Sequence, residues 1–150
     1  MAESNLQLCI QSYIIRRNEI NNLLSDLADQ KMLISYQQMR NTTKANAAKS
    51  ALRKQWSEKW EEDFNRASDQ DLFMERYGDY SAMEGYKEAF ESMNAEIARL
   101  EEELTAKENH IDNQVTTNST ELTEIKTWME SHKSMLKSNI ANDFKYGLNS

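Results

Sequence analysis

The side chains most able to do chemistry in this 150-residue sequence are its two histidines, its single cysteine and its runs of carboxylates. Helical bundles that bind metal ions through carboxylates use Glu-x-x-His pairs, but Lys107 and Met129 occupy the positions three before the histidines. The adjacent side chains of Glu101–Glu103 would splay around a helix and could not converge on one ion. Cys9 has no neighbouring histidine to activate its thiol. We therefore expect no enzyme, no metal site and no cofactor.

A run of basic residues offers a second kind of chemistry, the binding of phosphate. Residues 30–57 hold six lysines and arginines and no acid, although the whole chain has a net charge of −7. Binding of single-stranded nucleic acid uses aromatic side chains interleaved with basic ones, whereas Tyr36 and Trp56 lie near the ends of the run. Residues 95–110, in contrast, are rich in glutamate. We expect these two segments to face each other within the chain, and no nucleic acid to bind.

The elements that would position these residues are two long helices. Proline is absent and glycine occurs three times, so the sequence has few turn signals. Apolar residues recur at steps of three and four, which is the spacing of a coiled-coil seam. These features predict helices over about 4–66 and 82–146, joined by a connection at 68–80 with a short helix and an aromatic cluster. The fold class we expect is all-α, a long antiparallel helical hairpin (coiled coil) that forms a single domain over 1–150.

The pairing of the two helices can be predicted from the same apolar stripe. Matching apolar positions along the whole length places Leu6 opposite Phe144 and Ile10 opposite Ile140. A shift of seven residues would match the stripes as well, because both helices follow heptads. We favour the stated register because it uses the full length of both helices and leaves a connection of suitable size. Further along, it pairs Ile20 with Met129, Leu24 with Ile125, Leu52 with Ile97, Trp56 with Met93, Trp60 with Phe90 and Phe64 with Tyr86.

Polar residues interrupt the seam, mainly in the middle of the helices. In the predicted register Arg17 lies opposite His132, and Lys31 lies opposite Asn118. Buried polar positions in a coiled coil reduce stability but fix register and partner number. The alternative is that a two-stranded seam is wet enough to tolerate them. The residues that we expect to set the register are Arg17, Lys31, Gln38, Asn41, Glu108, Asn118 and His132.

The chain carries more apolar residues than a two-stranded hairpin needs. The surplus lies outside the seam and belongs to the half of the hairpin that contains both termini. A wide apolar stripe calls for a further helix to cover it, and exposed patches of this kind mark sites of association. We therefore expect a protein interface formed by Ile14, Ile15, Leu23, Met32, Leu33, Tyr36, Trp128, Met135, Tyr146 and Leu148.

These features favour a non-catalytic structural subunit that assembles with itself through its terminal helices, as a helical bundle or a filament-like array. The alternative is a cytoplasmic coiled-coil chaperone, scaffold or adaptor that binds a partner helix. The longest apolar runs, such as Tyr13–Ile15, are too short to cross a bilayer or to form the core of a signal peptide. We expect no membrane insertion and a cytoplasmic location by default, with export by a signal-less route left open.

Overall fold

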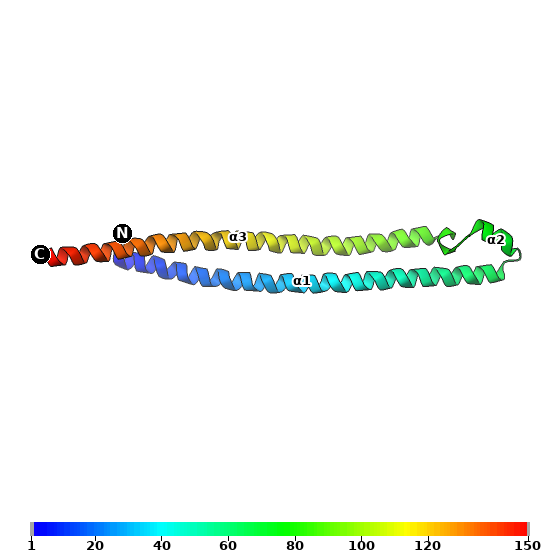
Figure 1. Cartoon of the computed structure of the whole chain (residues 1–150), viewed down its shortest axis with the longest axis horizontal. Coiled ribbons are helices and arrows are strands. Elements are labelled where there is room, and N and C mark those ends of the chain that lie inside the picture. The colour runs from blue at the N-terminus through cyan, green and yellow to red at the C-terminus, as the bar shows by residue number, and fades with distance from the viewer. Residues whose placement is uncertain (1, 150) are drawn as a thin grey trace. The chain divides into compact units, whose positions relative to one another are not determined.

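The computed structural model describes residues 2–149, and the side chains of residues 2–147. Its elements are α1 (Glu3–Arg66), the short α2 (Gln70–Arg76), the 3-10 helix η1 (Tyr80–Ala82) and α3 (Tyr86–Asn149) (Figure 1). No strand occurs among these described residues. The two long helices pack against each other, which confirms the all-α helical hairpin.

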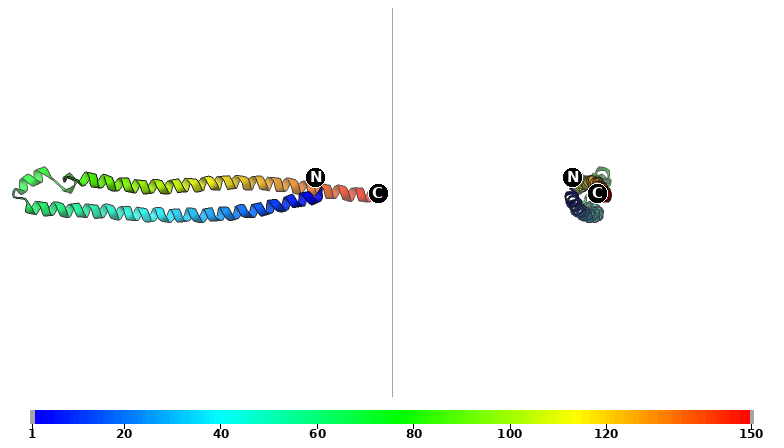
Figure 2. Two further views of the ribbon diagram at one scale, coloured as in Figure 1. Left: turned by 180° about the vertical axis from the view of Figure 1, so that it is seen from behind. Right: turned by 90° about the vertical axis from the view of Figure 1, so that its left-hand side faces the viewer.

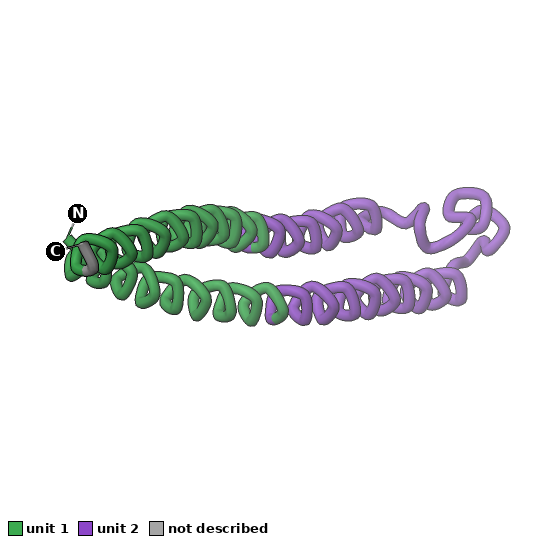
Figure 3. The backbone as a smooth tube through the Cα atoms, turned by 60° about the vertical axis from the view of Figure 1, so that its left-hand side comes forward, with its two compact units in different colours: residues 1–32, 108–150 green, residues 33–107 purple. Residues whose placement is uncertain are grey.

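The chain divides into two compact units (Figure 3). Unit 1 comprises residues 1–32 and 108–150, and unit 2 comprises residues 33–107. Each unit contains a stretch of α1 that runs antiparallel to a stretch of α3, and unit 2 also contains the connection (Figure 2). The single domain over 1–150 stays a prediction.

Side-chain caps and one glycine determine where the elements of the connection begin. Asp69 caps α2 by accepting a hydrogen bond of 3.1 Å from the backbone N–H of Leu72. Asp79 caps η1 in the same way, with a bond of 2.8 Å from the N–H of Ser81. Gly85, just before α3, has a φ of +90°, which residues with a side chain rarely adopt. The second long helix therefore begins at Tyr86, whereas the predicted start was near residue 82.

The core of unit 1 is one apolar seam between the two long helices. Ile20 of α1 is fully buried and forms a cluster with Ile125 and Met129 of α3. Leu6 and Leu27 are also buried. These residues all belong to the predicted apolar stripe, so the face that each helix turns inward agrees with the prediction.

Aromatic rings pack around the connection in unit 2. Trp60 stacks on Phe64 with 5.3 Å between the ring centroids, and Phe73 of α2 lies against both rings. The indole Nε1 of Trp60 donates a hydrogen bond of 2.9 Å to the backbone carbonyl oxygen of Tyr77. The predicted short helix and aromatic cluster are thus confirmed, and together they hold the connection against the last turns of α1.

The predicted register is wrong by about one heptad in unit 2. Tyr86 packs edge-on against Trp56, with 5.8 Å between the ring centroids, in the place predicted for Met93. Phe64, predicted to face Tyr86, contacts Phe73 of the connection instead. The physical reason is that the connection folds back along the end of α1 and occupies the space assigned to the first turns of α3.

In unit 1 the predicted neighbours Ile20 and Met129 share one cluster, and Leu24 packs against that cluster, which also holds Ile125. The polar contact of Lys31, however, departs from the prediction in the same direction as in unit 2. The Nζ atom of Lys31 lies 2.8 Å from a carboxylate oxygen of Asp112, six positions before the predicted neighbour Asn118. Ile140 and Phe144, predicted to pair with residues of α1, are 50% and 69% exposed. The final turns of α3 therefore leave apolar side chains uncovered in unit 1.

Candidate protein-interaction surfaces

The polar positions of the seam lie at its edges. Among the described side chains, none that is polar or charged is buried. Lys31 is about half exposed, and its hydrogen bond to Asp112 raises the pKa of its ammonium group. Asn118, its predicted partner, donates a hydrogen bond of 2.8 Å to the carbonyl oxygen of Gln114 on its own helix. The predicted Lys31–Asn118 layer is therefore wrong.

The predicted layer of Arg17 and His132 is also arranged differently. The ring of His132 lies edge-on against Tyr13, with 5.2 Å between centroids, and its Nδ1 atom is 2.7 Å from the carbonyl oxygen of Trp128. Arg17 is half-buried one turn further along α1. Tyr13 thus occupies the position that the predicted register gave to Arg17.

The remaining predicted polar positions lie in different units. Gln38 and Asn41 belong to unit 2 and Glu108 to unit 1, and all three are half-buried. The side-chain oxygen of Asn41 accepts a hydrogen bond of 2.9 Å from Gln37 on its own helix. The role of these residues in setting the register stays a prediction.

An ion pair that sequence reasoning missed joins the helices of unit 1. The guanidinium of Arg16 donates two hydrogen bonds to the carboxylate of Glu121, with distances of 2.8 and 3.0 Å. This arrangement lowers the pKa of Glu121, because the cation favours the charged carboxylate. The two residues flank the apolar seam, where charged side chains are common in coiled coils. The opposite charges of the two residues are visible in the sequence, but the predicted register did not place Arg16 opposite Glu121.

Unit 1 exposes most of the apolar side chains that were predicted to form an interface. Ile15 is 61% exposed on α1, and Trp128 is 47% exposed on α3. Ile14, in contrast, is half-buried against the core cluster and belongs partly to the intrachain packing. Leu148 lies outside the residues whose side chains are described. The other predicted residues exposed in this unit are Leu23, Met32, Met135 and Tyr146, and the prediction missed Leu8, Ile140 and Phe144.

Unit 2 exposes a second apolar strip on α1 alone. Leu33 is 66% exposed and Tyr36 is similarly open, and both were predicted. Met39, which was not predicted, extends the strip. An open groove of about 560 Å³ runs along Tyr36 and Met39 and is bordered by the basic side chains of Arg40 and Lys44. This groove combines an apolar floor with positive charge.

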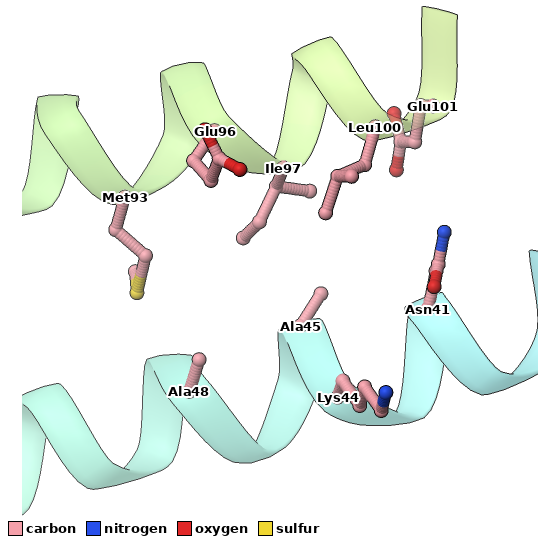
Figure 4. A pocket seen from close by; sticks show the side chains of 9 residues that line it. All are labelled: Asn41, Lys44, Ala45, Ala48, Met93, Glu96, Ile97, Leu100 and Glu101. Carbon is pink, nitrogen blue, oxygen red and sulfur yellow. The ribbon is translucent and has the colours of Figure 1, made fainter. Parts of the chain in front are cut away.

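A separate cavity of about 250 Å³ lies between α1 and α3 in unit 2 (Figure 4). Ala45 points towards Ile97 and Leu100 of α3, and Ala48 points towards α3 near Met93. The small alanine side chains leave the space between the helices unfilled. No sequence pattern indicated this cavity, since the predicted register placed Leu52, and not Ala45, opposite Ile97. The cavity is open to solvent at its sides and has an apolar lining.

The borders of this cavity carry opposite charges. Lys44 lines it from α1, and Glu96 and Glu101 line it from α3. Glu96 also bonds to Arg99 on its own helix, at 2.6 Å, which lowers the pKa of Glu96. The ion pair between Glu96 and Arg99 therefore lies within α3. The sequence had instead predicted that the acidic residues of 95–110 face the basic residues of α1.

The described residues hold no group of three or more histidine, cysteine or acidic side chains that is arranged to bind a metal ion. None of the described helices is long and apolar enough to cross a membrane. No protein-family model matches the chain, and no curated protein and no solved structure is significantly similar to it. The function is therefore inferred from the exposed surfaces.

Proposed function

We propose that this protein is a non-catalytic structural subunit that assembles with itself through the apolar surface of unit 1. The observation that carries this proposal is the exposure of large apolar side chains on both helices of that unit, for example Ile15 on α1 and Trp128 on α3. An exposed apolar surface of this kind is a typical site of protein association.

The spacing of these residues supports one continuous face on each helix. Leu8 and Ile15 are seven residues apart on α1, and Leu23 follows eight residues later. Trp128 and Met135 are also seven residues apart on α3. Residues at heptad spacing lie on the same side of a helix, so each helix of unit 1 has a second apolar face besides the seam. A second pair of helices can cover these faces, as in a four-helix bundle.

The energy available from this contact is large enough to hold an assembly together. Full burial of a large apolar side chain contributes about 1.5–3 kcal/mol, and side chains that are already partly covered, such as Leu23 and Met135, contribute a part of that. Several such side chains must offset the loss of translational and rotational freedom on association, which is estimated at about 4–15 kcal/mol. The exposed residues of α1 and α3 together can meet this requirement, whereas either helix alone supplies only a few of them.

The groove on α1 of unit 2 supports a second candidate function, that of a cytoplasmic chaperone, scaffold or adaptor. Tyr36 and Met39 form its apolar part, and Arg40 and Lys44 add positive charge. Such a groove suits an amphipathic partner helix with apolar anchors and acidic neighbours. Self-assembly is the preferred proposal because the surface in unit 1 involves two helices and more apolar residues.

Light scattering coupled to size-exclusion chromatography tests this proposal directly. We expect the wild-type protein to form dimers or larger assemblies and the double variant Ile15→Gln/Leu23→Gln to be monomeric. Its helicity, measured by far-UV circular dichroism, should remain, because both side chains lie outside the buried seam. The matched control is Leu72→Gln, which removes a similarly exposed leucine from α2 and should leave the mass unchanged. A monomeric wild type at about 100 μM would overturn the proposal and favour the adaptor function.

A further inference from the structure

We infer that a second copy of this chain docks over the cavity of unit 2 and runs in the same direction, so that α1 of each copy lies against α3 of the other. This inference rests on the proposed self-assembly and adds a contact in unit 2 to the one proposed in unit 1. The four helices would surround a two-fold axis parallel to them.

The first argument comes from the cavity itself. Its floor is formed by Ala45, Ala48, Ile97 and Leu100, and its volume is about 250 Å³. A space between two helices that is lined by apolar atoms and open at the side loses both dispersion contacts and hydrophobic burial. Side chains from a second pair of helices would recover these contacts. Exposed Leu100, at the edge of the cavity, would then be covered as well.

The second argument comes from the charges on either side of the cavity. Lys44 stands on the α1 side, in a stretch of residues 30–57 that contains no acid. Glu96 stands on the α3 side, at the start of a segment rich in glutamate. Arg99 pairs with Glu96 on α3, but acidic side chains outnumber basic ones in residues 95–110. The surface is therefore positive along α1 and carries a net negative charge along α3. Such a surface is complementary to a copy of itself in one orientation only.

The orientation follows from the symmetry. If the two-fold axis runs parallel to the helices, Lys44 of each copy faces the glutamates of the other copy. The symmetry makes two such contacts in the dimer. If the axis runs across the helices, the copies lie in opposite directions, and Lys44 approaches Lys44 of the other copy. Like charges placed against each other disfavour association, so the parallel axis is selected.

The same charge pattern favours a second copy over a single partner helix. A partner helix that lies in the cavity would have to be acidic along one edge and basic along the other. The chain itself already supplies these two edges at matching heights, because Lys44 and Glu96 line the same cavity from opposite helices. In a two-fold contact the basic edge of each copy then lies against the acidic edge of the other.

Charge reversal at these two positions tests the inference. The variants are Lys44→Glu, Glu96→Lys and the combination of both, and the measurement is the dissociation constant of the assembly by analytical ultracentrifugation. We expect each single variant to weaken association about tenfold or more, because it creates two repulsive contacts in the assembly. The combined variant should return to within about threefold of the wild type, because the opposite charges face each other again.

Two controls separate association from folding. Lys54→Glu and Glu88→Lys make the same charge changes at exposed positions that do not line the cavity, and should alter the dissociation constant by less than about twofold. Thermal unfolding followed by circular dichroism should show that every variant remains folded at the temperature of the measurement.

The outcomes distinguish this inference from the proposed function. A wild type that assembles, with single variants that associate as tightly as the wild type, overturns the inference and leaves self-assembly standing. If Lys44→Glu binds the wild type more tightly than the wild type binds itself, the copies run in opposite directions and the inference is wrong. A wild type that is monomeric throughout overturns both.

Discussion

The indole Nε1 of Trp60 donates a hydrogen bond of 2.9 Å to the backbone carbonyl oxygen of Tyr77. This bond fixes the connection against α1, and the ring of Phe73 adds to it by packing 5.7 Å from the ring of Trp60. The last turns of α1 are therefore covered by the connection and are not available to α3. As a result α3 begins beside Trp56, and the register in unit 2 differs from the predicted one by a heptad.

Replacing Trp60 by phenylalanine should destabilise the protein. The ring contacts with Phe64 and Phe73 are largely retained, but the carbonyl of Tyr77 loses its donor. We expect the free energy of unfolding in urea to fall by about 1–2 kcal/mol. The matched control, Leu72→Gln, changes an exposed side chain of the connection and should alter it by less than about 0.5 kcal/mol. Equal losses in the two variants would contradict the importance assigned to this bond.

The register of unit 1 can be measured through Lys31. A double-mutant cycle of Lys31→Met with Asp112→Asn should show a favourable coupling, because the two side chains are 2.8 Å apart. The same cycle with Asn118→Ala should show none, because Asn118 bonds to its own helix. Unfolding in urea at low salt is the suitable measurement, since salt screens exposed pairs. Coupling of Lys31 to Asn118 and not to Asp112 would show that the register predicted from the sequence is correct in unit 1.

The helical hairpin could be predicted because its determinants are local. The absence of proline and the apolar spacing of three and four specify two long helices, whatever their partners are. The register could not be predicted in the same way, because heptads match equally well after a shift of seven residues. The choice is made by tertiary contacts of the connection, namely the packing of Phe73 on Trp60 and the hydrogen bond from Trp60 to the carbonyl oxygen of Tyr77.

Most exposed residues of the candidate surfaces could be predicted from one helix, although Leu8 and Met39 were missed, and the residues that depend on the pairing of two helices were not predicted. Ile15 and Leu33 are exposed as predicted, because their positions outside the seam follow from helical periodicity alone. Phe144 was assigned to the seam, and the assignment failed with the register. The cavity beside Ala45 was missed for the same reason, since its existence depends on which residues of α3 lie opposite the alanines.

Acid should weaken the contact between Arg16 and Glu121. The pKa of Glu121 lies below its ordinary value of 4.5, because Arg16 bonds to the ionised carboxylate. The unfolded chain binds this proton more readily than the folded chain, so the stabilising contribution is present above that value and is lost as the pH falls through the folded pKa. Glu121→Gln should therefore lower stability near neutral pH and make the decline in acid less steep.

Urea unfolding midpoints between about pH 7 and about pH 3 measure this effect. The matched control is Glu124→Gln, an exposed glutamate on the same helix. It should leave both the stability near neutral pH and its decline in acid close to those of the wild type. If the two variants have the same pH profile, the contact with Arg16 contributes nothing specific.

Filling the cavity of unit 2 should stabilise the single chain and weaken its association. In Ala45→Leu the added carbon atoms enter the apolar space opposite Ile97 and Leu100. We expect the free energy of unfolding to rise by about 0.5–2 kcal/mol, because each buried methylene contributes about 0.8 kcal/mol when it fits without strain. Ala47→Leu is the control, because Ala47 is exposed and does not line the cavity; it should change stability by less than about 0.5 kcal/mol.

The same leucine at position 45 should weaken the assembly, because it occupies space that the inferred second copy would fill. Unfolding at concentrations below the dissociation constant reports the first effect, and ultracentrifugation reports the second. A variant with lower stability than the wild type would show that the space closes in solution and that the two helices pack more tightly there.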